Sequence, residues 1–193
     1  MTHRRSLNRA DIVALFTDLA DELAAHDERA SLFVVGGAAM SLAFDDRRST
    51  NDVDAAFEPS AAVRRAASSV AARRELSEDW LNDGAKGFMP GNDSAAKIIF
   101  ERPSLRVEIA SPEYLLAMKV MSARVEQDTD DILILYRILG LRTVEEGLDI
   151  ASRHYGAVGM QSMLRPHSSY LLETVVELLR APESNAPAVS TDD

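Results

Sequence analysis

Hydrophobic and polar residues alternate with two different periods along this chain, and the change of period divides it into two parts. In the first 110 residues, short apolar runs typical of strands are mixed with stretches of helical period. From residue 111 onward, apolar residues recur at helical spacing alone. The pattern predicts an α/β core over residues 1–110 and an all-helical part over residues 111–180. Residues 181–193 are polar, hold two prolines and show no period, so we expect a disordered tail there.

The ends of the elements follow from residues that start or stop regular structure. Asn8 is a helix cap with Asp11 at the third position, and the helix it starts ends near His26. A second clear start is Ser111, with Pro112 at the first helical position. Residues 81–94 hold three of the nine glycines and one proline, and predict a loop. Strands are predicted over residues 32–35, 53–57, 95–100 and 105–110, and further helices over residues 36–44, 60–76, 130–139, 143–155 and 168–179.

Composition excludes several classes of protein. A hydrophobic content of 46% is that of a normal globular core. No apolar run approaches the roughly 20 residues that a membrane span needs, and no apolar block follows the charged N-terminus as in a secretory signal. The chain has no cysteine, which excludes disulfides and thiolate metal sites. We therefore expect a cytoplasmic protein without a membrane partner.

The charge is strongly negative overall and uneven along the chain. A net charge of −10 argues against non-specific adhesion to nucleic acid, because phosphate contacts need cations. The eighteen arginines nevertheless cluster, and a local basic rim on an acidic body is one interpretation. The other interpretation, which we favour for residues 64–74, is a set of solvated helix faces. The clusters are Arg4, Arg5 and Arg9; Arg47 and Arg48; Arg64 and Arg65; and Arg73 and Arg74.

The first chemical signal is a glycine pair followed by two carboxylates. Gly36 and Gly37 end an apolar run, and they allow a backbone to approach an anion with a helix N-terminus aimed at it. Asp52 and Asp54 are separated by Val53, so a strand would project both carboxylates from one face. Two carboxylates so close together repel each other unless a cation lies between them, and a divalent metal is the usual cation. A metal site beside an anion cradle is suited to transfer of a phosphoryl or nucleotidyl group. The competing interpretation is an accidental Asp-x-Asp and a simple tight turn.

The second signal lies in the helical part. Lys119 stands among apolar residues, where a buried ammonium needs an anionic partner. As a compact point charge it suits a phosphate, although it could also extend its charged end to the surface. Asp128 and Asp131 lie three residues apart and could share a helix face, and Asp128 could instead cap the next helix. Arg124 could pair with either acid or contact a substrate phosphate.

Both signals resemble a known group of enzymes. The order of strand, glycine turn, short helix, arginine-rich loop and Asp-x-Asp strand resembles the nucleotidyltransferase superfamily signature. The run proline-glutamate-x-leucine-leucine-alanine-x-lysine that ends at Lys119, followed by an arginine and an aspartate-rich helix start, resembles the AbiEii and MenT-type nucleotidyltransferases. These are toxins of bacterial toxin–antitoxin systems, and the resemblance covers roughly residues 10–140.

The resemblance implies a fold, an activity and partners. The fold would be a minimal nucleotidyltransferase core, a small mixed sheet flanked by helices, with an all-helical C-terminal part. MenT-type members use a nucleoside triphosphate and magnesium to add nucleotides to the 3′ end of transfer RNA. The resemblance therefore implies a nucleoside triphosphate, Mg²⁺ (or Mn²⁺ in its place), transfer RNA and a cognate antitoxin as cofactor and partners.

The resemblance also implies roles for individual residues. Many nucleotidyltransferases carry a third carboxylate on a later strand, where this chain offers Glu108; otherwise Asp131 or Asp128 must supply the last acid. The resemblance carries Gly36 and Gly37 to the phosphate turn, Asp52 and Asp54 to the metal and Lys119 to the triphosphate. Our own hypothesis extends these roles: the nucleotide would be bound by Gly36, Gly37, Ser41, Thr50, Lys119 and Arg124, the metal by Asp52, Asp54 and Glu108, and RNA by Arg47 and Arg48. The expected catalytic set is Asp52, Asp54, Lys119 and Asp131.

We expect a magnesium-dependent nucleotidyltransferase toxin with an RNA acceptor. A small-molecule, antibiotic-type nucleotidyltransferase would keep the metal site but use a hydroxylated acceptor, and the acidic net charge favours it. A catalytically silent nucleotidyltransferase-like binding protein is the third reading, and the intact Asp52, Asp54 and Lys119 argue against it.

Overall fold

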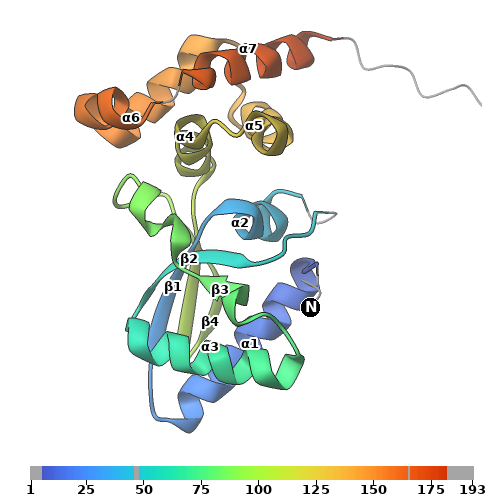
Figure 1. Ribbon diagram of the computed structural model, residues 1–193, viewed down its shortest axis with the longest axis vertical. Coiled ribbons are helices and arrows are strands. Elements are labelled where there is room, and N and C mark those ends of the chain that lie inside the picture. The colour runs from blue at the N-terminus through green and yellow to red at the C-terminus, as the bar shows by residue number, and fades with distance from the viewer. Residues whose placement is uncertain (1–5, 46–47, 165, 182–193) are drawn as a thin grey trace, which may run out of the picture.

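A five-stranded mixed sheet forms the centre of the computed structural model, which describes residues 6–45, 48–164 and 166–181 (Figure 1). The strand order is β3-β2-β1-β5-β4. Strand β1 (Ala30–Val34) pairs antiparallel with β2 (Val53–Glu58) and parallel with β5 (Leu105–Ile109). Strand β3 (Leu81–Asn82) is parallel to β2, and β4 (Lys97–Arg102) is antiparallel to β5. The predicted small mixed sheet is therefore confirmed.

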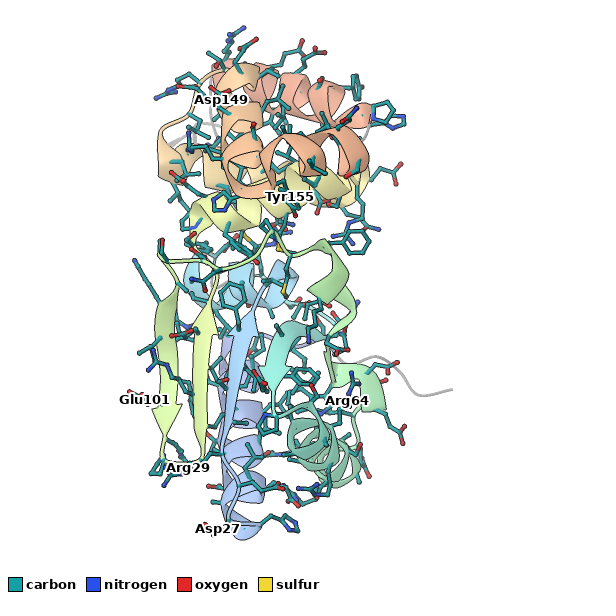
Figure 2. All side chains as sticks on the ribbon, turned by 90° about the vertical axis from the view of Figure 1, so that its left-hand side faces the viewer. Asp27, Arg29, Arg64, Glu101, Asp149 and Tyr155 are labelled. Carbon is teal, nitrogen blue, oxygen red and sulfur yellow. The ribbon has the colours of Figure 1, made fainter. Side chains whose placement is uncertain are left out.

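Two helices cover one face of this sheet. Helices α1 (Arg9–Ala25) and α3 (Ser60–Arg74) pack against each other, α1 against β4 and β5 and α3 against β2. In Figure 2 the strands lie in front of α1. Alternate residues of β5 explain the packing: Leu105, Val107 and Ile109 are buried, whereas Arg106 and Glu108 lie on the other face. The period-two pattern of the sequence thus selects the face that carries the helices.

Both predicted helix starts are confirmed. Asn8 caps α1 by accepting the Asp11 N–H at 3.0 Å, and the Asp11 carboxylate accepts the Asn8 N–H at 3.1 Å. At the start of α4 (Pro112–Ser122), the Ser111 hydroxyl accepts the Tyr114 N–H at 3.3 Å. These side-chain contacts satisfy amides that the first turn of a helix leaves without partners.

The helical part follows the last strand and lies beyond one end of the sheet (Figure 1). It consists of α4, α5 (Val125–Leu139), α6 (Val144–Met163) and α7 (His167–Arg180). Helix α5 starts five residues before the predicted position. The predicted end of α6 at residue 155 coincides with a kink at Gly156, where φ is 66°, and the helix resumes after that kink. The division of the chain into units at residue 110 stays a prediction, and the predicted tail lies outside the described residues apart from Ala181.

The predicted loop over residues 81–94 is partly wrong. The 3-10 turn η1 (Glu78–Trp80) comes directly before this segment. The segment itself begins with the short strand β3 and contains a second 3-10 turn, η2 (Gly84–Phe88). A strand of two residues is too short to show a period, so the sequence pattern could not reveal it. Buried Trp80 holds the segment in place by donating its indole N–H to the Ala67 carbonyl at 3.0 Å. Strand β4 begins and ends two residues later than predicted.

The short helix α2 (Gly36–Ala43) connects β1 to the loop before β2. It occupies almost the whole predicted range of residues 36–44. None of the described helices is both long and apolar enough to cross a membrane.

The arginines of residues 64–74 are exposed and paired with acids, which confirms their interpretation as solvated helix faces. Arg64 binds Asp83 at 2.6 Å, and Arg74 binds Asp18 at 2.6 Å. Arg65 and Arg73 are paired in the same way with Glu28 and Glu22.

Gly147→Ala should destabilise the contact between α5 and α6. A Cβ atom at residue 147 would lie 2.0 Å from the hydroxyl oxygen of Tyr136, which is fully buried and donates to the Thr143 carbonyl. Overpacking of this kind costs about 1–3 kcal/mol in the free energy of unfolding. Gly87→Ala is the control, because a Cβ there meets no atom within 4 Å. Equal denaturation midpoints for the two variants would contradict the packing described here.

Candidate active site

The glycine turn brings the start of α2 against the second strand. Gly36 has φ 65°, a left-handed conformation, and a Cβ atom there would lie 3.0 Å from the Asp54 Oδ2. Glycine is therefore needed both for its conformation and for the close approach. The Val35 N–H donates to the Asp54 carbonyl at 2.9 Å, which fixes the turn to β2. No side chain caps the N-terminus of α2, so its amides face the site without a protein acceptor from the cap residue.

Thr50 lies between the glycine pair and the aspartates. A Cβ atom at Gly37 would lie 3.1 Å from the Thr50 Oγ1, and that hydroxyl donates to the Asp52 carbonyl at 3.1 Å. Backbone hydrogen bonds in both directions between Leu7 and Thr50 fix this residue to the segment before α1. Thr50 therefore positions the chain that leads into the Asp-x-Asp sequence.

Asp52 and Asp54 lie together at the start of β2, with Val53 buried between them. Asp52 comes just before the strand and Asp54 is its second residue. Burial, and secondly the negative charge of Asp52, raises the pKa of Asp54 above its ordinary value. The pair is thus crowded enough to gain from a cation, which is the condition for a metal site.

Asn82 is a site residue that the sequence did not indicate. It lies on β3 in register with Asp54, and its Nδ2 donates to the Asp52 Oδ2 at 3.3 Å. Its Oδ1 accepts the Gly84 N–H at 2.9 Å, so the side chain is held in this orientation. No sequence signal could have found it, because the pairing of β3 with β2 is a tertiary contact.

The two carboxylates fit magnesium better than a metal that needs a full protein cage. Among the described residues, no group of three or more His, Cys, Asp or Glu side chains is placed to hold a metal ion. Magnesium commonly binds one or two carboxylates and completes its shell with water and substrate phosphates. Asp52 and Asp54 offer such a set of oxygen ligands, and they would bind the ion most strongly with a nucleotide present.

Glu108 is not brought to the aspartate pair. Glu108 on β5 is in register with Phe33 on β1, and Phe33 is in register with Ala56 on β2. Glu108 is therefore two strands away from β2, and level with a residue two positions after Asp54. Its carboxylate accepts from the Arg106 guanidinium at 2.6 Å. Glu108 therefore lies on the face that sequence alternation predicted, but it is paired elsewhere.

A pocket of about 370 Å³ opens beside Asp54. We call it the Asp54 pocket, and its polar lining includes Gly36, Asp54, Lys119 and Arg124. Phe88 of η2 and Met118 of α4 belong to its apolar wall. The pocket combines a backbone turn, a carboxylate and two cationic residues from elements far apart in the sequence.

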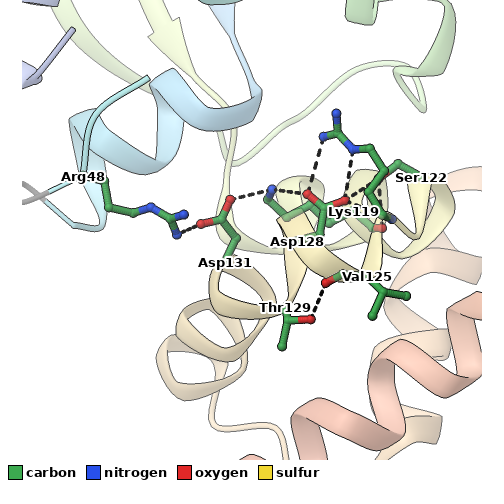
Figure 3. A network of polar contacts seen from close by, with 8 residues as sticks. Arg48, Lys119, Ser122, Val125, Asp128, Thr129 and Asp131 are labelled. Atoms are coloured by element: carbon green, nitrogen blue, oxygen red, sulfur yellow. Dashed lines mark hydrogen bonds and ion pairs between the residues drawn. The ribbon is translucent and has the colours of Figure 1, made fainter. Parts of the chain in front are cut away.

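Lys119 is buried between two carboxylates, so the alternative of a lysine reaching the surface is wrong. Its ammonium lies 2.9 Å from the Asp128 Oδ1 and 2.7 Å from the Asp131 Oδ2 (Figure 3). Burial lowers the pKa of Lys119, and Asp128 counteracts this shift. Burial also opposes ionisation of Asp128, but Lys119 and Arg124 outweigh it and hold the pKa of Asp128 below its ordinary value. The ammonium and the two carboxylates therefore form a buried network of ion pairs.

Asp128 has two roles. It lies in the first turn of α5, and its Oδ2 accepts from the N–H of the cap residue Arg124 at 3.3 Å and from the Ser122 hydroxyl at 3.0 Å. The Arg124 Nε also donates to it at 3.3 Å, although the Arg124 side chain is 61% exposed. Asp128 thus caps the N-terminus of α5 from within its first turn and at the same time binds Lys119.

Arg48 joins the core to this cluster. Its guanidinium pairs with the Asp131 Oδ1 on the side away from Lys119 (Figure 3). Its carbonyl accepts the Ser41 hydroxyl at 2.9 Å, and Ser41 is buried, so Ser41 supports the loop and does not line the Asp54 pocket. The neighbouring Arg47 lies outside the described residues.

A mixed five-stranded sheet, a glycine turn into a helix and two adjacent carboxylates on the next strand define a nucleotidyltransferase-like fold and site. Over residues 10–146 the chain matches the model of a family described as "Nucleotidyltransferase of unknown function (DUF6036)", and it belongs to that family. Neither the curated proteins nor the solved structures gave a match. The match supports the superfamily; the narrower toxin type stays a proposal.

Asp54→Asn should stabilise the protein when no metal is present. Because the pKa of Asp54 is raised on folding, the folded state binds a proton more readily than the unfolded state. The free energy of unfolding that depends on this carboxyl group therefore falls as pH rises from about 3.9 through the folded pKa, and the full cost is present above the folded pKa.

Thermal unfolding at pH 7 should show a higher Tm for Asp54→Asn than for the parent in chelator. Added Mg²⁺ should raise the Tm of the parent but not of the variant, because binding to the folded state adds stability. Asp149→Asn, an exposed acid in α6, is the charge-matched control. A lower Tm for Asp54→Asn in chelator would show that the pair does not repel.

Lys119→Met should cost about 3–5 kcal/mol of folding stability, the scale for breaking a buried ion pair by removing one of its partners. Adding Asp131→Asn to this variant should recover part of the loss, since it removes one of the two buried carboxylates that lose the Lys119 ammonium. Chemical denaturation of the single and double variants measures the coupling. Additive effects would mean that the Lys119–Asp131 contact contributes nothing.

Proposed function

We propose that this protein transfers a nucleoside monophosphate from a nucleoside triphosphate to an RNA acceptor, with Mg²⁺ (or Mn²⁺) as cofactor. The observation that carries the proposal is the crowded pair Asp52 and Asp54 against the glycine turn, with Asp54 in a pocket that Lys119 and Arg124 also line. The family to which the chain belongs is one of nucleotidyltransferases.

The reaction assigns a role to each part of the Asp54 pocket. The acceptor hydroxyl would lose its proton to water as its oxygen bonds to the α-phosphorus, the bond from that phosphorus to the bridging oxygen would break, and pyrophosphate would leave with the displaced electron pair. Asp52 and Asp54 would hold the metal, which would neutralise negative charge on the reacting phosphates. Asn82 would keep the Asp52 carboxylate in position.

The triphosphate would be bound by groups that face the pocket from both parts of the chain. The amides at the start of α2 and the positive end of its dipole would receive one phosphate. The Arg124 guanidinium is exposed and already oriented by Asp128, so it could bind a phosphate at little ordering cost. Lys119 would contribute a positive charge from the wall of the pocket, where Asp128 and Asp131 hold its ammonium in place.

The acceptor and the biological role rest on the resemblance to the AbiEii and MenT-type toxins. We propose the 3′ end of transfer RNA as acceptor, a toxin–antitoxin system as context, a cognate antitoxin as protein partner and the cytoplasm as location. Arg48 would contact the RNA, although Asp131 already pairs with it.

A small-molecule acceptor is the second candidate. The net charge of −10 and the apolar wall formed by residues such as Phe88, Leu115 and Met118 favour a compact, uncharged or cationic acceptor. The two candidates differ in salt dependence, because an RNA acceptor releases counterions on binding and a small molecule without phosphates does not.

Incubation with each labelled nucleoside triphosphate, Mg²⁺ and total transfer RNA should give labelled RNA. Asp52→Asn should reduce the rate at least about a hundredfold, the scale for losing one preorganised electrostatic group. Asp149→Asn should leave it unchanged. Label on a small hydroxylated molecule, with none on RNA, would favour the second candidate; near-normal transfer by Asp52→Asn would remove the metal site from the mechanism.

A further inference from the structure

A second hollow of about 840 Å³ lies between the N-terminus of α1, the C-terminal end of α2 and one side of α5. We call it the arginine groove, since Arg9, Arg48 and Arg137 line it together with Phe44. It shares no lining residue with the Asp54 pocket. The groove therefore needs an explanation of its own.

Among the residues that the structure describes, two arginines of this groove, Arg9 and Arg137, lack the acidic partner that most arginines of the core have. Most core arginines are paired with an acid, as Arg102 is with Asp21 at 2.9 Å and Arg64 with Asp83 at 2.6 Å. In the described part of the chain, the exposed side chains of Arg9 and Arg137 make no ion pair, although acids outnumber bases in the protein by 31 to 21. Neither guanidinium group is therefore neutralised by an acid of the described chain, so both can bind an anionic ligand.

The other lining residues narrow the class of that partner. Phe44, half-buried at the end of α2, offers an aromatic face beside the arginines, and Leu133 and Ile134 of α5 add apolar surface. An aromatic surface among cations is the usual composition of a groove for single-stranded nucleic acid, where bases stack and phosphates bind arginine. Two acids, Asp45 and Asp130, also line the groove and limit its affinity for anions.

The groove is close enough to the aspartate pair to serve the same reaction. Arg48 precedes Asp52 by four residues, so at most about 14 Å of extended chain separates their Cα atoms. A single strand bound along the arginines could extend that far to present its end.

We propose that the arginine groove binds the single-stranded 3′ end of the acceptor RNA, with its phosphates on Arg9 and Arg137 and a base against Phe44. This inference rests on the proposed RNA acceptor. Arg48 belongs to the groove but is a poor probe, because its removal would also leave the Asp131 carboxylate without one of its partners.

The test is equilibrium binding of a fluorescent single-stranded RNA to the full chain, without nucleoside triphosphate, over a range of salt concentrations. Arg9→Ala combined with Arg137→Ala should weaken binding at least about tenfold and reduce the slope of log K against log salt by about 1.4, the value for two lost single-strand phosphate contacts. Arg64→Ala combined with Arg102→Ala is the control, because it removes the same charge from elsewhere.

Two further variants separate the contributions of stacking and charge. Phe44→Leu should weaken binding severalfold and leave the salt slope unchanged, since stacking releases no counterions. Asp130→Asn, which removes an exposed acid from the groove, should tighten binding. Melting curves of each variant check that the fold is intact.

The failure of this inference can be distinguished from failure of the proposed function. If the parent binds and labels RNA while the Arg9/Arg137 variant keeps the parental affinity and slope, the groove is not the RNA site but the function stands. If the parent neither binds nor labels RNA, the proposed acceptor and the groove assignment are both wrong.

Discussion

The buried ammonium of Lys119 is the constraint on which the arrangement of the helical part depends. A charge removed from water must be neutralised at close range, and here Asp128 and Asp131 both lie within 2.9 Å of it. To bring them there, the chain must turn sharply between α4 and α5, which it does with Ala123 at φ 46°. Asp131 also pairs with Arg48, so the carboxylate that neutralises Lys119 connects the helices to the loop before β2.

Charges of opposite sign alternate through this cluster from Arg48 through Asp131, Lys119 and Asp128 to Arg124. The two terminal arginines line different hollows, Arg124 the Asp54 pocket and Arg48 the arginine groove. Each is held by an acid before any ligand arrives, which lowers the ordering cost of binding a phosphate. The network therefore supports cations on both sides of the junction between the sheet and the helices.

The sequence was sufficient for features that depend on local patterns. The glycine turn, the placement of Asp52 and Asp54 and the burial of Val53 all followed from spacing and strand alternation, and the structure has them. Contacts between distant segments were not accessible in this way. Asn82 could not be found because its strand has only two residues, too few to show a pattern. Strand alternation shows which face Glu108 lies on, but it cannot show whether the carboxylate binds a metal or pairs with Arg106.

Binding of Mn²⁺, followed by electron paramagnetic resonance, tests the central claim that Asp52 and Asp54 form a metal site completed by a nucleotide. The metal should bind weakly to the protein alone and more tightly with a non-hydrolysable nucleoside triphosphate, and the nucleotide should gain affinity by the same factor. Asp52→Asn should abolish this mutual gain. An unchanged Mn²⁺ affinity in that variant, with the nucleotide present, would contradict the account.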